Sequence, residues 1–116
     1  MLIIGGGYIG AELAQMFARA GVKVALVCRS RLLPEAEPEI GAALTEYFEG
    51  EGITVISGIA YGAIRKTGDG VSLTVTRDGQ DRTIDADRVL IAAGRTPDIE
   101  ALAAARRLGE WPRSCA

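Results

Sequence analysis

The sequence predicts an α/β fold in which a parallel sheet carries helices on one side and a three-stranded antiparallel β-meander on the other. Two observations support this prediction. The first half of the chain alternates short apolar runs with segments of helical periodicity, the βαβαβ order that builds parallel sheets. The second half changes to short segments separated by tight-turn signals, with apolar and polar residues alternating most clearly in residues 71–75, which is typical of antiparallel strands.

The first half is expected to form three strands and two helices. Residues 2–4 are apolar and run directly into three glycines, which indicates a buried strand ending in a turn. Apolar residues at helical spacing follow, and Gly21 is the expected stop signal. The run 22–28, apolar except for Lys23, is typical of a parallel strand buried on both faces. A polar loop, a helix that starts at about Pro38 or Glu39 and ends between Gly50 and Gly52, and a short strand over 53–56 complete this half.

The second half is expected to form the meander and one returning strand. Short strands are predicted over 63–66, 71–76 and 82–86, joined by turns at 67–70 and 78–79. The segment 88–93 is apolar again after Arg88 and leads into Gly94-Arg95-Thr96-Pro97. They predict one more buried strand that rejoins the parallel sheet.

The composition of the 116-residue chain excludes several kinds of chemistry. The chain has no histidine, so imidazole bases and histidine-ligated zinc cannot occur within it. Cys28 and Cys115 are far apart and form no CxxC motif, so no catalytic residue and no metal ligand is predicted. The net charge of −2 argues against nucleic acid as a partner. No apolar run has membrane-spanning length and no export signal opens the chain, which suggests a cytoplasmic protein.

The glycine turn is the strongest functional signal. Gly5, Gly7 and Gly10 have the GxGxxG spacing, after a predicted strand and at the start of a predicted helix. In a Rossmann-like fold, the first glycine permits the tight turn, the second lets the backbone approach a pyrophosphate, and the third lets the helix pack closely. The phosphates would meet free backbone N–H groups and the positive end of the helix dipole. The alternative is a glycine turn that binds no ligand.

The end of the second strand indicates which dinucleotide would bind. Sites for NAD and FAD usually place an acidic residue there to accept a hydrogen bond from the ribose 2′-hydroxyl, but this chain has Cys28. Arg29, Ser30 and Arg31 follow, and two guanidinium groups with a hydroxyl suit a 2′-phosphate. The sequence therefore predicts NADPH over NADH. The alternative is that both arginines are ordinary solvated charges.

Two segments carry a resemblance to a known family. Residues 5–12, Gly-Gly-Gly-Tyr-Ile-Gly-Ala-Glu, resemble the NAD(P)-binding domain of the FAD-dependent pyridine nucleotide–disulfide oxidoreductases. Residues 89–98 are similar to the strand and GRxPN segment that close this domain, and residues 24–41 look most like mercuric reductase. The resemblance implies a Rossmann-like domain over 1–98 and an atypical, truncated or altered tail over 99–116.

The resemblance also implies roles for individual residues. The backbone from Gly5 to Glu12 would bind the pyrophosphate and nicotinamide half, with Tyr8 over the nicotinamide pocket and Glu12 orienting the ring. Arg29 and Arg31 would hold the 2′-phosphate, the backbone near Tyr61 would touch the adenosine, and Gly94 would lie on the nicotinamide side. The expected cofactor-binding residues are Gly5, Gly6, Gly7, Tyr8, Ile9, Gly10, Glu12, Arg29, Ser30, Arg31, Tyr61 and Gly94.

The family implies that NADPH passes hydride to FAD, and that FAD and a redox disulfide belong to other parts of the parent reductase. The FAD and interface domains would then be the partners of this chain, which alone would bind dinucleotide weakly and catalyse nothing. One alternative is a non-catalytic NAD(P)-sensing Rossmann module, against which the meander and residues 94–97 argue. Another is the FAD-binding Rossmann domain itself, against which Cys28 argues.

Overall fold

The structure, a computed structural model, describes residues 1–96 of the chain. The expectations for the tail 99–116, and for Pro97 and Asp98 in the second motif, lie outside these residues. The described part contains two helices and seven strands. They are β1 (Leu2–Ile4), α1 (Tyr8–Arg19), β2 (Ala25–Val27), α2 (Pro38–Gly50), β3 (Thr54–Ile56), β4 (Ala60–Thr67), β5 (Gly70–Arg77), β6 (Gln80–Ala86) and β7 (Val89–Ile91).

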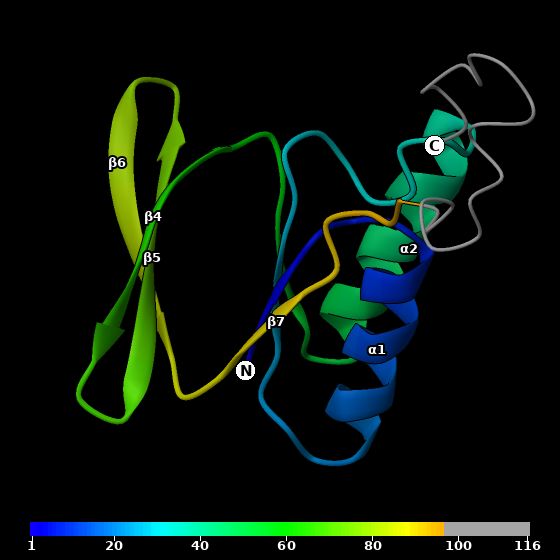
Figure 1. Ribbon diagram of the computed structural model, residues 1–116. Coiled ribbons are helices and arrows are strands. Elements are labelled where there is room, and N and C mark those ends of the chain that lie inside the picture. Colours follow the sequence, from blue (N-terminus) through cyan, green and yellow to red (C-terminus); the bar gives the residue numbers. More distant parts are fainter. Residues whose placement is uncertain (97–116) are drawn as a thin grey trace, which may run out of the picture.

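The strands form two sheets. The parallel sheet has the order β3-β2-β1-β7, so β1 pairs with β2 on one side and with the returning strand β7 on the other. The antiparallel sheet is the meander β4-β5-β6. Figure 1 shows both helices on one side of the parallel strands and the meander on the opposite side. The predicted α/β architecture is therefore confirmed.

The two faces of the parallel sheet bury different cores, because successive side chains of a strand point to opposite faces. Ile3 and Leu26 pack with residues of both helices, among them Phe48 of α2. Leu2, Ile4 and Val27 pack against Leu73 and Val75 of the meander. This double burial explains why β1 and β2, in the middle of the sheet, have continuous apolar sequences.

Several elements have bounds that differ from the expected ones. The apolar run 22–28 forms a strand only over Ala25–Val27, because the Val22 N–H donates to the Phe17 carbonyl oxygen and closes the end of α1 instead. The returning strand is likewise limited to Val89–Ile91. In contrast, β4 begins at Ala60 and not at residue 63, since its ladder with β5 continues to Thr76 past an irregularity between Tyr61 and Ile64.

The turn between β5 and β6 follows its sequence signal. Asp78 and Gly79 both have positive φ, 53° and 74°, as a type I′ hairpin turn requires.

Neither helix in the described range 1–96 has the length and apolar character needed to cross a membrane.

Candidate functional site

The glycine turn lies at the carboxyl edge of the parallel sheet, between β1 and α1. Gly5 has a φ of +122°, and its N–H donates a 2.9 Å hydrogen bond to the Val27 carbonyl oxygen of β2. A side chain at Gly5 would collide with the Ala92 carbonyl, and one at Gly10 would collide with the Gly5 carbonyl. The turn after β1, the start of α1 and the chain leaving β7 therefore meet at one place, so the structure brings the two sequence motifs together.

Gly6 is required by the packing of the loop after β2. A Cβ at Gly6 would lie 2.8 Å from the Cys28 Cβ and 3.0 Å from the Arg31 carbonyl oxygen. The Gly6 carbonyl also accepts a 2.7 Å hydrogen bond from the Leu33 N–H. The glycine turn and this loop are thus in direct contact.

Gly7 differs from the other three glycines of the turn. Its φ is −77°, which any residue can adopt, and an added Cβ would meet no atom within 4 Å. It is the N-cap of α1, where it has no side chain to cap the N–H groups of the first turn, and those groups have no intrahelical acceptor. The partially positive end of α1 therefore faces open space beside Gly7. Internal packing explains Gly5, Gly6 and Gly10 but does not explain Gly7.

At the end of β2, Cys28 and the two residues after it have different environments. The Cys28 side chain is buried, with 3% of its surface exposed, and burial raises the pKa of its thiol. Arg29 and Ser30 are exposed, and within residues 1–96 their side chains make no hydrogen bond or ion pair. The backbone of Ser30 is fixed, since its carbonyl accepts a 2.9 Å hydrogen bond from the Gly58 N–H. The Arg29 and Ser30 side chains are therefore available to an external group, whereas the Cys28 thiol packs inside the protein.

Arg31 has a different environment from Arg29. Its guanidinium is partly buried and donates to backbone carbonyl oxygens of Leu33, Pro34 and Ala36 at 2.9 to 3.3 Å. From the sequence, both arginines were expected to bind the 2′-phosphate. In the structure the guanidinium of Arg29 is unengaged, whereas that of Arg31 is hydrogen-bonded within its own loop.

Tyr61 comes from the meander but reaches the end of β2. Its hydroxyl donates a 3.2 Å hydrogen bond to the Val27 carbonyl oxygen, which also accepts from the Gly5 N–H. Burial raises the pKa of the Tyr61 hydroxyl, the nearby Cys28 raises it further, and the positive charge of Arg29 opposes the shift. The structure therefore places Tyr61 beside the residues that were expected to contact the adenosine half.

The residues expected near the nicotinamide are exposed. Tyr8 and Ile9 are exposed at the start of α1, and Glu12 is exposed further along the helix. Gly94 follows β7 with a φ of +140° and is also exposed. A hollow of about 410 Å³ lined by Ile91 and residues 93–96 lies at the carboxyl end of β7.

Some residues of this edge were not identified from the sequence. Ala92 packs against the glycine turn, and Gly41 of α2 lets the helix approach the loop, since a Cβ there would lie 2.5 Å from the Leu32 carbonyl oxygen. A glycine inside a helical pattern was the available signal for Gly41, because it lowers helix stability unless close packing requires it.

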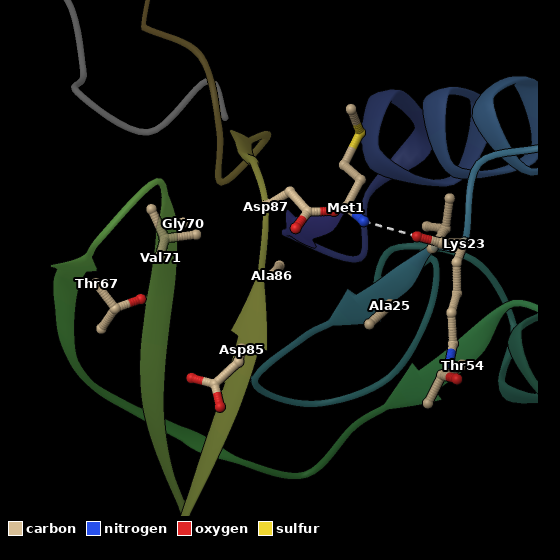
Figure 2. A pocket seen from close by; sticks show the side chains of 11 residues that line it. Met1, Lys23, Ala25, Thr54, Thr67, Gly70, Val71, Asp85, Ala86 and Asp87 are labelled. Carbon is tan, nitrogen blue, oxygen red and sulfur yellow. Dashed lines mark hydrogen bonds between the residues drawn. The ribbon is translucent and has the colours of Figure 1, made fainter.

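A second cavity lies at the opposite end of the parallel sheet. It has a volume of about 430 Å³ and is bordered by Lys23, Ala25 and Thr54 and by Asp85 and Asp87 (Figure 2). Ala25 and Thr54 begin β2 and β3, so this cavity is at the amino ends of the strands. Ligands of open α/β sheets bind at the carboxyl ends, which is where the glycine turn lies.

In residues 1–96, no group of acidic or cysteine side chains is arranged to hold a metal ion.

Comparison with known sequences points to one family. The sequence profile described as pyridine nucleotide-disulphide oxidoreductase matches residues 1–110. The mercuric reductase of Streptomyces lividans is 46% identical over 95 residues, which are 82% of this chain and 20% of that protein. The mercuric reductase of Staphylococcus aureus is 41% identical over 88% of this chain and 19% of its own length. The dihydrolipoyl dehydrogenase of Geobacillus stearothermophilus is 33% identical over 88% of this chain and 22% of its own length. The chain spans about a fifth of the length of these relatives.

Solved structures of similar fold include a reductase and two nicotinamide nucleotide oxidases. A ferredoxin reductase from Rhodopseudomonas palustris matches with a TM-score of 0.78 and 30% identity, over 90% of this chain and 26% of that one. The NADH oxidase of Lactobacillus brevis bound to NADH matches with a TM-score of 0.81 and 21% identity, over 97% of this chain and 24% of that one. An engineered NADPH oxidase derived from it, bound to NADPH, has the same values. At 21% identity the two oxidases support the fold alone.

Proposed function

Because this chain belongs to the pyridine nucleotide-disulphide oxidoreductase family, we propose that it is the NADPH-binding domain of a mercuric reductase-like flavoenzyme. The whole enzyme would use a nicotinamide that supplies hydride and a flavin in another domain that accepts it. Within that enzyme, the role of this chain is to bind and orient the dinucleotide. The proposal places the protein in the cytoplasm, where its two widely spaced cysteines would stay reduced.

The open space beside Gly7 carries the proposal. A glycine that neither its φ nor any neighbour within 4 Å requires is explained by a group that approaches the backbone from outside. That group would face the uncapped N–H groups and the positive dipole end of α1, which favour an anion. A dinucleotide pyrophosphate is the anion that fits this turn, with the N–H groups of Tyr8, Ile9 and Gly10 as donors.

The end of β2 supports NADPH as the dinucleotide. The guanidinium of Arg29 and the hydroxyl of Ser30 are unengaged within residues 1–96, and both can donate to a 2′-phosphate. Cys28 offers no carboxylate to repel that phosphate, and its thiol is buried.

The other expected site residues are proposed to contact the two ends of the dinucleotide. Tyr61 lies beside Val27 and is proposed to contact the adenosine. Tyr8, Glu12 and Gly94 lie on the exposed side near α1 and the end of β7 and are proposed to surround the nicotinamide. The FAD and interface domains of the parent enzyme are the proposed partners of this exposed edge.

The proposal is tested by calorimetric titration of the chain with NADPH, NADH and FAD. We expect NADPH to bind at least about tenfold more tightly than NADH, because charge-assisted hydrogen bonds to the 2′-phosphate are absent from NADH. Equal affinities would contradict the 2′-phosphate assignment. Preferential binding of FAD would instead identify the chain as a flavin-binding Rossmann domain.

A further inference from the structure

Arg31 is engaged by the loop that contains it. One terminal nitrogen, Nη2, donates to the carbonyl oxygens of Pro34 at 3.0 Å and Ala36 at 2.9 Å. The other, Nη1, donates to those of Leu33 and Ala36 at 3.3 Å. The planar guanidinium thus joins three carbonyls of one short loop, an arrangement that its fork of donors favours.

This loop, residues 31–36, has a strained and closely packed backbone. Leu33 has a φ of +45°, which is rare for a residue with a side chain. It stays there because its side chain is buried, with 8% exposed, and because its N–H is bonded to Gly6. A 2.9 Å hydrogen bond from the Ala36 N–H to the Leu33 carbonyl closes the turn. On its other side, the loop contacts Gly41 of α2 through the Leu32 carbonyl.

From this geometry we propose that Arg31 is a positioning residue, which fixes loop 31–36 against the glycine turn and so supports the binding of NADPH and NADH alike. The inference rests on the proposed function and assigns different roles to the two arginines. Arg29 contacts the 2′-phosphate and selects NADPH. Arg31 acts through Leu33 and Gly6 on the shape of the pyrophosphate turn, which both dinucleotides share.

Substituting Arg31 would have consequences beyond the loss of one charge. The Pro34 and Ala36 carbonyls would each lose the guanidinium as a donor, and the Leu33 carbonyl would keep only the Ala36 N–H, so the turn around Leu33 would be less constrained in its left-handed conformation. The Leu33 to Gly6 hydrogen bond would then open more often, and the turn would be less well ordered before the ligand arrives. Ordering the turn on binding lowers the affinity for any dinucleotide.

The test compares Arg31→Ala, Arg29→Ala and the surface control Arg65→Ala at a temperature well below unfolding. Arg31→Ala is expected to weaken NADPH and NADH by the same factor, about tenfold, and to increase hydrogen exchange at the Leu33 and Ala36 amides. Arg29→Ala is expected to weaken only NADPH, by roughly 10- to 100-fold, with unchanged exchange at both amides. A selective loss of NADPH in Arg31→Ala, with Leu33 still protected, would overturn the proposal.

Two further measurements keep the outcome decisive. Arg31→Lys retains the charge but not the planar fork, so it should behave like Arg31→Ala. Unchanged affinity for both dinucleotides in Arg31→Lys, with Leu33 still protected, would show that only the charge matters and would overturn the proposal. In the unmodified chain, the guanidinium resonances of Arg31 should be observable without ligand and unshifted by NADPH, whereas those of Arg29 should shift. Equal binding of NADPH and NADH by the unmodified chain would overturn the NADPH assignment, but not the role of Arg31 in the loop.

Discussion

The backbone N–H of Leu33 donates a 2.7 Å hydrogen bond to the carbonyl oxygen of Gly6, which ties the loop after β2 to the glycine turn after β1. Through this bond, the segment expected to read the adenosine ribose and the segment expected to hold the pyrophosphate become one unit. The bond also shows why the glycines of the turn are not equivalent. Gly6 is required by the loop and Gly5 by the chain after β7, while Gly7 contacts neither.

A methyl group at Gly7 should abolish most dinucleotide binding without unfolding the protein. We expect Gly7→Ala to cost less than about 1 kcal/mol of stability, since alanine is only a poorer N-cap residue than glycine. We expect its affinity for NADPH to fall at least about tenfold, because the methyl group would occupy the space of the pyrophosphate. Calorimetric titration and thermal unfolding measure the two effects.

Gly50→Ala is the matched control for this substitution. An added Cβ at Gly50 also meets nothing within 4 Å, and Gly50 ends α2 without a positive φ. This variant should bind NADPH normally and unfold at the same or a slightly higher temperature. If Gly7→Ala also bound NADPH normally, the pyrophosphate would not lie beside Gly7.

Gly10→Ala should show the opposite pattern, with a direct loss of stability. The added methyl group would be forced against the carbonyl group of Gly5, and backbone atoms cannot move aside cheaply. Overpacking of this kind costs about 1–3 kcal/mol, which corresponds to a fall in Tm of roughly 5 °C or more. An unchanged Tm in thermal unfolding would show that α1 can shift away from β1 without cost.

The ion pair between Arg19 of α1 and Glu51 after α2 should stabilise the fold in a pH-dependent way. The Glu51 carboxylate accepts hydrogen bonds from Arg19 at 2.7 and 3.0 Å and from Gln15 at 2.9 Å. The hydrogen bond with Arg19 lowers the pKa of Glu51 below its usual 4.5. The contribution to stability is therefore present above that usual pKa and is lost as the pH falls through the lower, folded-state value.

The difference in Tm between the unmodified chain and Glu51→Gln tests this expectation. It should be present at pH 7, should begin to shrink as the pH falls below about 4.5, and should be nearly gone once Glu51 is protonated. The variant Glu46→Gln, on the exposed surface of α2, controls for the loss of one negative charge. A difference that stayed constant down to pH 2 would mean that the ion pair does not contribute.

Much of the fold could be predicted because its signals are local. The apolar run before the glycines, the helical spacing after them and the Asp78-Gly79 turn each depend on neighbouring residues, and all three have the expected structure. The boundaries of β2 and β4 could not be predicted in the same way. They depend on which hydrogen-bond partners the rest of the fold supplies, such as Phe17 for Val22 and Thr76 for Ala60.

The candidate site divides in a similar way between what the sequence determines and what the tertiary structure decides. The sequence alone determined that a glycine turn opens a helix and that two arginines and a serine follow β2, because motif spacing and residue type are properties of the chain. Only the tertiary structure decided that Arg29 is exposed while Arg31 binds the carbonyls of its own loop, and that Gly7 alone among the four glycines of the turn faces open space. The physical reason is that both depend on the folded path of the backbone, which places the carbonyls of loop 31–36 around the Arg31 guanidinium and brings Ala92 and Cys28 against the glycine turn. The distances to those atoms exist only in the folded chain.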